Sequence, residues 1–234
     1  MSQQIPYGGS NRILAALPKT VFEQFFLRLE PVGLTLRETL QDAANSIGYV
    51  YFIESGVTSI LMIMANGATI EVGMVGPEGM IGVPGVLGGD LSAQQVIVQA
   101  PGTALRLPLP LCKKAFDESP AVRSVMLRFA GALLDLSAQT AACNRLHSIE
   151  QRCARWLLMA LDRVQSETVP MTHEFLASML GVRRAGVTTT AGELQRSGLI
   201  TYRQREITIR DRTGLEAAAC ECYRLDHERL NRLL

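Results

Sequence analysis

The sequence predicts an α+β protein, with strands in its first half and helices in its second, on three observations. Residues 49–107 read as short β-strands separated by glycines, residues 122–147 carry a long helical stripe, and residues 171–210 show two short helices followed by a wing. The chain has 234 residues, 47% of them hydrophobic, which is enough for one large or two small cores. We therefore expect an N-terminal β-roll, a long dimerisation helix and a C-terminal winged helix-turn-helix.

Composition and charge exclude several classes of protein. No run of roughly 18 apolar residues, as a membrane span requires, is present. The N-terminus lacks the pattern of a secretory signal, so we expect a cytoplasmic protein without a membrane partner. Five cysteines are an odd count in a chain of this size, which predicts reduced thiols rather than a disulfide framework.

The β zone is divided by glycine-containing dipeptides. The strand pattern YVYFIE is expected to turn at Ser55 and Gly56, and the next strand, VTSILMIM, at Asn66 and Gly67. Glycines then recur at every third residue from Gly73 to Gly88. Tight turns of the β-roll are one explanation for these glycines, and a modified ligand cradle is the other.

The long helix carries one stripe of side chains with alternating spacings of four and three residues. Such a stripe needs a partner, which is either the same helix of a second chain or the protein's own β unit. Its length favours the homodimer. The predicted dimer seam consists of Val122, Met126, Phe129, Leu133, Leu136, Thr140 and Cys143.

The C-terminal segment has a helix-turn-helix pattern. Ser148 and Gln151 are spaced as a capping box that starts a helix. Further on, MTHEFLASML begins with Thr172 as a cap and ends at Gly181, and a second helix follows over residues 183–196. Residues 198–210 read as two short strands with a charged turn. Residues 171–212 hold seven arginines, no lysine and four acidic residues, so motif and positive charge coincide and favour nucleic-acid binding over a merely solvated face.

Four stretches together resemble the cyclic AMP receptor protein/fumarate-nitrate reduction regulator family of bacterial transcription factors. They are YFIESG (51–56), THEFLASMLGV (172–182), GLI (198–200) and ITIRDR (207–212). The resemblance covers nearly the whole chain. It implies a cyclic-nucleotide-binding-type β-roll sensor over residues 1–119, a dimerisation helix over 120–147 and a winged helix-turn-helix DNA-binding domain over 148–234.

The resemblance also implies roles for individual residues. In such regulators the start of the second helix enters the major groove, so the base-reading residues would be Arg183, Arg184, Ala185, Thr188 and Thr189. Thr172, His173, Arg203 and Arg205 would contact the DNA backbone. Ala185 and Thr189 depart from the Glu and Arg of the best-known members, which predicts a different operator sequence. The implied partners are double-stranded DNA, a second copy of the chain and RNA polymerase.

The sensing half departs further from the family. Cyclic-nucleotide binders of this fold use a Glu for the ribose and an Arg for the cyclic phosphate, and residues 79–96 contain neither. We therefore expect weak or no binding of cyclic AMP, no cofactor, and an unknown effector. The possible effector pocket is Gly79, Gly82, Val83, Pro84, Gly85, Ala93 and Gln94.

Other chemistries find little support. No cysteine precedes Cys112, which disfavours the N-terminal iron–sulfur cluster of some family members. Cys220 and Cys222 with His227 supply only part of a metal site, and His147 beside Cys143 reads as a seam residue, so no metal site is predicted. No catalytic constellation stands out, so we expect no enzyme. Two alternatives stay open: a constitutive DNA binder with a vestigial pocket, and a small-molecule-binding protein or enzyme that uses the glycine-rich residues 73–89.

Overall fold

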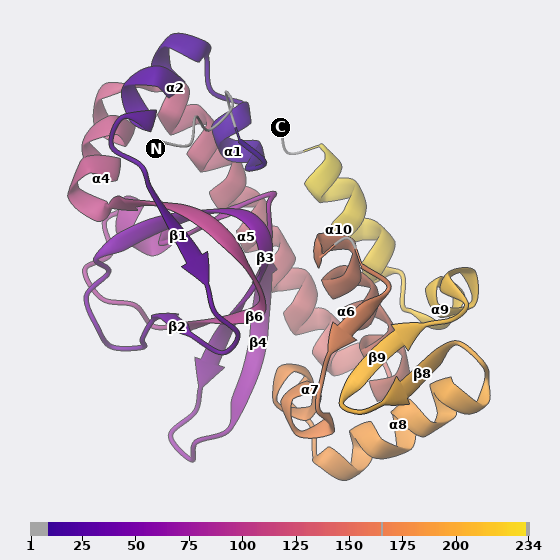
Figure 1. The fold of residues 1–234 in the computed structure, drawn as a ribbon. Helices are drawn as coiled ribbons and strands as arrows, with labels where there is room; N and C mark the ends of the chain where they lie inside the picture. The colour runs from indigo at the N-terminus through magenta and orange to yellow at the C-terminus, as the bar shows by residue number, and fades with distance from the viewer. Residues whose placement is uncertain (1–8, 165, 233–234) are drawn as a thin grey trace.

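The computed structural model describes residues 9–164 and 166–232 (Figure 1). The first eight residues of the predicted sensor domain, and Gln165 and the last two residues of the predicted DNA-binding domain, lie outside the described residues. The N-terminal half contains, in order, α1 (Arg12–Ala15), α2 (Lys19–Phe26), β1 (Glu30–Leu34), β2 (Thr39–Gln41), β3 (Tyr49–Ile63), β4 (Thr69–Val75), β5 (Met80–Ile81), α3 (Val83–Val86), β6 (Gln95–Pro108) and α4 (Leu109–Glu118). The long helix α5 (Pro120–Leu146) follows, within one residue of its predicted bounds.

The strands form one antiparallel sheet that closes into the predicted roll. Its order is β1-β6-β3-β4, with β2 paired to β6 and β5 paired to β3. Alternate side chains of these strands point inward, and Phe52, Met80 and Leu105 are among the largest side chains that are fully buried. The roll therefore has its own hydrophobic core, which the side chains of α5 complete.

The predicted turn at Ser55 and Gly56 is wrong. The chain runs through both residues as the single strand β3, whose pairing with β6 shifts in register on either side of Ser55. Gly56 has a φ of 82°, and a Cβ there would lie 2.6 Å from the carbonyl oxygen of Ala100. The glycine thus marks a β-bulge at a close approach of two strands, whereas the turn predicted at Asn66 and Gly67 does connect β3 to β4.

The residues of the predicted dimer seam face the interior of the same chain. Val122, Met126, Phe129, Leu136 and Cys143 are all buried within one protomer, and Leu133 packs against the core of the roll. Thr140 accepts a hydrogen bond from Arg155 at 3.1 Å. This burial favours the packing of the stripe on the protein's own β unit, which is the other explanation that its pattern allows.

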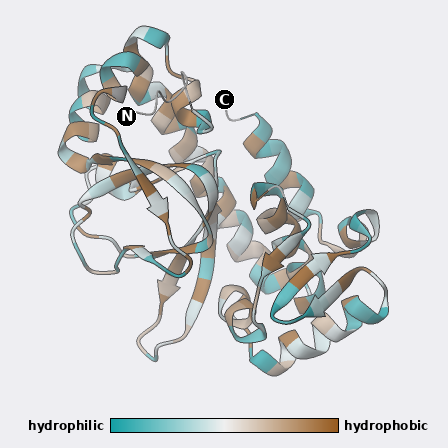
Figure 2. Ribbon diagram, in the orientation of Figure 1, coloured by the Kyte–Doolittle hydropathy of each residue, from teal (hydrophilic) through white to brown (hydrophobic). Residues whose placement is uncertain are grey.

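The C-terminal half is a compact module built on α6. It contains α6 (Ile149–Val164), β7 (Thr168–Pro170), α7 (His173–Leu180), α8 (Arg184–Arg196), β8 (Ile200–Arg203), β9 (Glu206–Ile209), α9 (Arg212–Ala218) and α10 (Cys222–Asn231). The predicted capping box is present. The backbone N–H of Ser148 donates to Gln151 Oε1 at 3.1 Å, and the backbone N–H of Gln151 donates to Ser148 Oγ at 3.2 Å. The strongly hydrophobic residues of α6 lie inside this module, next to the three-stranded sheet β7-β9-β8 (Figure 2).

The roll and the C-terminal module share one interface, where polar side chains accompany apolar ones. The hydrophobic cluster around α6 includes Met74 and Ala100 of the roll. Arg163 of α6 forms a buried ion pair with Glu78, with Nε 2.7 Å from Oε1. Trp156 Nε1 donates to Glu71 Oε1 at 2.9 Å. The two halves are therefore joined by specific contacts to β4 and the segment that follows it. Among the described residues, none of the helices combines the length and apolar sequence that crossing a bilayer requires.

Glu71 makes the stability of this interface dependent on pH. Burial raises the pKa of its carboxyl from 4.5 to about 7. The folded protein therefore keeps a proton that the unfolded chain releases above pH 4.5, so stability is expected to fall as the pH rises from about 5 to about 7. Glu71→Gln, which stays neutral, should stabilise the protein by up to about 3 kcal/mol at pH 8 and by little at pH 5.

Chemical denaturation of both proteins across this pH range measures that difference. The exposed Glu23→Gln substitution serves as the control and should leave the pH profile unchanged. A difference between Glu71→Gln and the parent protein that does not vary with pH would contradict the protonated state of Glu71.

Candidate DNA-binding surface

Helix α7 begins and ends as its sequence predicts. Thr172 Oγ1 accepts the backbone N–H of Phe175 at 3.1 Å, which caps the first turn. At the other end Gly181 has a φ of 63°, and its N–H returns to the carbonyls of Ala177 and Ser178. A Cβ on Gly181 would lie 2.5 Å from Cδ1 of Ile70, so this position both reverses the chain and packs closely on β4.

Helix α8 presents the predicted base-reading residues on one exposed face. Its buried side holds Val187, Thr190, Ala191 and Leu194. The exposed residues of its first two turns and its N-cap are Arg183, Arg184, Ala185, Thr188 and Thr189. No side chain caps the N-terminus of α8, so backbone N–H groups and two arginines together make this end electropositive.

The wing forms as predicted, but its turn has a backbone conformation that the sequence did not predict. Strands β8 and β9 pair antiparallel, and the two residues between them, Gln204 and Arg205, have φ values of 52° and 65°. Two left-handed residues in succession are typical of the two-residue hairpin turn that matches the twist of its strands. Arg203 and Arg205 are both exposed, and the backbone N–H of Met171 donates to the carbonyl of Arg205 at 2.7 Å. The wing is therefore fixed against the residues that precede α7.

His173 contacts both helices of the motif and the wing. Its Nδ1 lies 3.1 Å from Thr188 Oγ1, and its ring stacks on Tyr202, with the centroids 4.3 Å apart. Burial, and secondarily the positive charge of Arg184, lower the pKa of His173. The ring thus orients α8 relative to α7 and β8. The role of Tyr202 could not be predicted from the sequence, because nothing in the local pattern indicates a partner for a histidine 29 positions earlier.

The residues of the possible effector pocket differ in their exposure to solvent. Gly79, Gly82, Val83 and Gly85 are buried in packed surroundings: a Cβ on Gly79 would lie 2.4 Å from the ring of Phe129, and one on Gly85 would lie 2.7 Å from Leu109. Pro84 and Gln94 are half-buried and Ala93 is exposed. The close contacts favour the packing explanation for Gly79 and Gly85, where a ligand cradle would need free space.

The cysteine and histidine residues are grouped differently from the sequence expectation. Cys220 and Cys222 lie beside Cys143 and His147, and His227 is not part of the group. Each pair is visible in the sequence, but their contact could not be predicted, because 77 positions separate Cys143 from Cys220.

Comparison with known proteins agrees with this geometry. Residues 151–218 match the family model of the Crp-like helix-turn-helix domain. Two curated relatives are a global nitrogen regulator of Synechococcus elongatus, 23% identical over 170 residues, and one of Nostoc, 22% identical over 173 residues. The match spans 68% of this chain in both cases and 76% of each relative.

Solved structures share the fold over most of the chain. A putative Crp/Fnr transcriptional regulator of Eubacterium rectale superposes with a TM-score of 0.70 and 16% identity, covering 89% of this chain and 98% of that one. FixK2 of Bradyrhizobium japonicum gives a TM-score of 0.70 with 15% identity, covering 82% and 98%. The chain therefore carries a Crp-like helix-turn-helix domain and has the fold of the Crp/Fnr regulators, which confirms the resemblance found in its sequence.

Proposed function

We propose that the protein is a cytoplasmic, sequence-specific transcription regulator that binds double-stranded DNA as a homodimer, and that it is not an enzyme. The observation that carries this proposal is the exposed face of α8, with Arg183 and Arg184 at its electropositive start, in a Crp-like helix-turn-helix domain. A helix of this kind fits the major groove, and the adjoining wing brings two more arginines to the phosphate backbone.

The side chains on the exposed face of α8 indicate which base each position would contact. Arg184 can donate two hydrogen bonds to O6 and N7 of guanine. The methyl groups of Ala185 and Thr189 suit contacts with thymine, since the Thr189 hydroxyl already donates to the carbonyl of Ala185 at 3.1 Å. The phosphate backbone of the DNA would be contacted by Thr172, His173, Arg203 and Arg205. This set favours an operator that differs from those read by members with Glu and Arg in place of Ala185 and Thr189.

The homodimer would use the outer face of α5. Leu127 and Leu134 are 46% and 71% exposed, and with Gly131, Ala138 and Ala141 they form an exposed stripe, spaced by four and three residues, opposite the buried one. Apolar and small side chains at this spacing allow two helices to approach closely. The stripe extends from the roll towards the DNA-binding module, so pairing here would place two copies of α8 on one operator.

Regulation would act through the contacts between roll and module. Residues 79–96 lack the Glu and Arg of a cyclic AMP site, so we infer that another signal acts on the roll. Because Glu71 and Glu78 contact Trp156 and Arg163 of α6, movement of β4 or of the segment after it would be transmitted to α6. The signal would shift the population between two arrangements of the recognition helices. RNA polymerase is the expected partner of the DNA-bound form.

Selection from a random DNA library with substituted proteins tests the roles of these residues. Arg184→Ala is expected to lose preference at one base pair in each half-site, at a cost of roughly 1–3 kcal/mol. Arg203→Ala, the matched control on the wing, should keep the same sequence preference, bind more weakly to all sequences, and reduce the slope of log affinity against log salt by about 1. If Arg184→Ala kept the parental preference at every position, the assignment of α8 as the reading helix would be wrong.

A further inference from the structure

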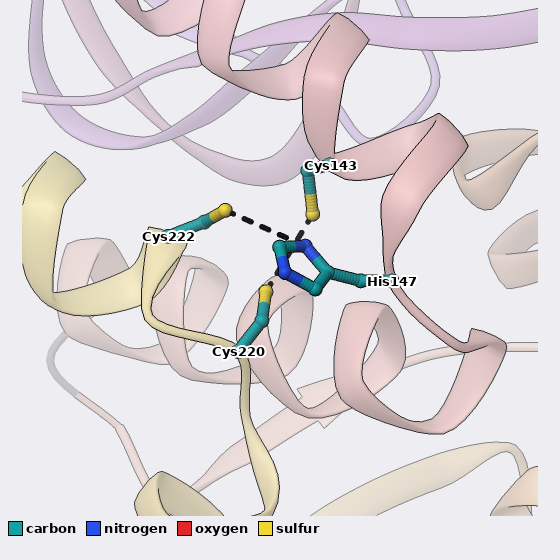
Figure 3. Close-up of side chains that lie close together, drawn as sticks. All are labelled: Cys143, His147, Cys220 and Cys222. Carbon is teal, nitrogen blue, oxygen red and sulfur yellow. Dashed lines mark hydrogen bonds between the residues drawn. The ribbon is translucent and has the colours of Figure 1, made fainter.

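Four potential metal ligands meet where the long helix ends. Cys143 lies in the last turn of α5 and His147 directly follows the helix, while Cys220 lies between α9 and α10 and Cys222 is the first residue of α10 (Figure 3). Their Sγ and ring nitrogen atoms all lie within 4.8 Å of one another. The three cysteines are buried and form a small cluster of their own, separate from both hydrophobic cores. The cluster thus joins the long helix to the C-terminal part of the DNA-binding module.

The distances within the cluster fit one tetrahedral ion. A Zn²⁺ ion with sulfur at 2.3 Å and nitrogen near 2.05 Å would hold its ligands about 3.8 Å apart for two sulfurs and about 3.6 Å apart for sulfur and nitrogen. Cys143 Sγ lies 3.5 Å from Cys220 Sγ, and Cys222 Sγ lies 3.7 Å from His147 Nδ1. A disulfide, by contrast, needs sulfur atoms about 2.0 Å apart, and all five cysteines are free thiols.

A second layer of hydrogen bonds orients the ligands. His147 directs Nδ1 into the cluster and places Nε2 3.2 Å from Oε2 of Glu221. A carboxylate on the far nitrogen is the usual support of a metal-bound histidine, because it fixes the tautomer and the ring. Gln139 Nε2 also donates to Cys222 Sγ at 3.1 Å. Each contact thus holds the side chain of one member of the cluster in place.

Two arginines of α6 lie close to the cluster. Arg152 and Arg155 both interact favourably with the charge on Cys143. Arg155 is already paired with Asp226, so Arg152 is the cation that can balance the single net negative charge of three thiolates and one neutral histidine around a divalent cation.

We propose that Cys143, His147, Cys220 and Cys222 form a closed Cys₃His site for a single Zn²⁺ ion. Four protein ligands leave no position for water or substrate, so the site would be structural rather than catalytic. Binding of the ion would release the thiol protons of the three cysteines to solvent. The ion would fix the end of α5 to the start of α10, and with it the position of the DNA-binding module on the long helix.

Metal analysis of the full-length protein, purified under reducing conditions without a metal-affinity tag, tests this proposal. We expect about one zinc per chain in the parent protein and in Cys112→Ser and Cys153→Ser, which alter buried thiols outside the cluster. Cys143→Ser and Cys220→Ser should lose at least nine-tenths of the bound zinc. His147→Ala should lose most of it, whereas His147→Cys, which restores four ligands, should retain it.

A second readout does not depend on the folding of variants. Protein stripped of metal at low pH and refolded with Co²⁺ should develop the visible bands of tetrahedral cobalt and the near-ultraviolet charge transfer of cobalt thiolate, and Zn²⁺ should abolish both. If the parent protein held less than about one-tenth of an equivalent of metal and gave no such spectrum, the proposal would be overturned. A Cys143–Cys220 disulfide found by mass spectrometry in freshly isolated protein would overturn it as well. None of these measurements involves DNA, so they are independent of the proposed function.

Discussion

Replacement of Leu134 by aspartate is expected to prevent the proposed homodimer from forming and to weaken operator binding at least about 100-fold. Leu134 is 71% exposed in the single chain and lies at the centre of the outer stripe of α5. A charge at this position would be buried against the second helix, at a cost no neighbour offsets. Affinity falls steeply because the second half-site is bound at high effective concentration only while the chains are joined. Sedimentation analysis would report the mass of one 25.5 kDa chain.

Two other substitutions separate the outer stripe from the buried one. Leu27→Asp, on an 85% exposed leucine after α2, should leave both dimer mass and DNA binding unchanged. Met126→Ala, in the buried stripe, should lower the free energy of unfolding by about 2–5 kcal/mol and leave the protein dimeric. A dimer that survives Leu134→Asp but dissociates with Met126→Ala would show that the chains meet elsewhere.

Substitution of Arg163 by methionine is expected to have the largest effect on stability. The ion pair with Glu78 is nearly inaccessible to solvent, with side-chain exposures of 6% and 9%. Without Arg163 the Glu78 carboxylate keeps only the N–H of Gly76, at 3.2 Å, and loses the cation that compensates its burial. Removing one partner of such a pair costs about 3–5 kcal/mol. The melting temperature should therefore fall by roughly 10 °C in differential scanning calorimetry.

A double-substitution cycle isolates the ion pair from the loss of side-chain packing. Arg163→Met combined with Glu78→Gln removes both charges and keeps an acceptor for Gly76, so it should recover more than half of the lost stability. Arg210→Met, on an exposed arginine at the end of β9, controls for the loss of an arginine as such. If Arg163→Met cost less than about 1 kcal/mol, the pair would behave as a solvated surface contact and would not join roll and module.

The parts of the structure that were predictable from sequence depend on local signals. The capping box at Ser148 and Gln151, the cap at Thr172 and the stop at Gly181 are set by hydrogen bonds that span only a few residues. The exposed positions of α8 follow from helical periodicity once Val187, Ala191 and Leu194 are placed inside. For this reason the helix-turn-helix and its outward residues could be located without the fold.

The errors arise where a pattern has two physical explanations. A glycine in a strand sequence is consistent with a turn or with a bulge, and at Gly56 the close carbonyl of Ala100 decides in favour of the bulge. An apolar stripe on a helix shows that one face is buried, but it does not show which element covers that face. In α5 the stripe packs against the roll of the same chain. The outer stripe that we propose for the dimer has no clear signal in the sequence, because Gly131, Ala138 and Ala141 are too small to stand out as hydrophobic.

Contacts between distant segments could not be predicted at all. Trp156 meets Glu71 across 85 positions, and Cys143 meets Cys220 across 77. A Cys-x-Cys pair and a Cys-x₃-His pair each supply half of a metal site, and only the packing of α10 against α5 brings the halves together. The ligand types were visible in the sequence, but their common location was not.

Selection from a random double-stranded DNA library would show whether the protein binds specific DNA sequences as a dimer. The parent protein would be used with and without cyclic AMP, and the enriched sequences would be determined. We expect one two-fold-symmetric motif, with half-site centres about one helical turn apart, enriched equally in both conditions. Enrichment only with cyclic AMP would contradict the inferred absence of a nucleotide site. Weak binding without any enriched motif, under either condition, would contradict sequence-specific recognition by α8.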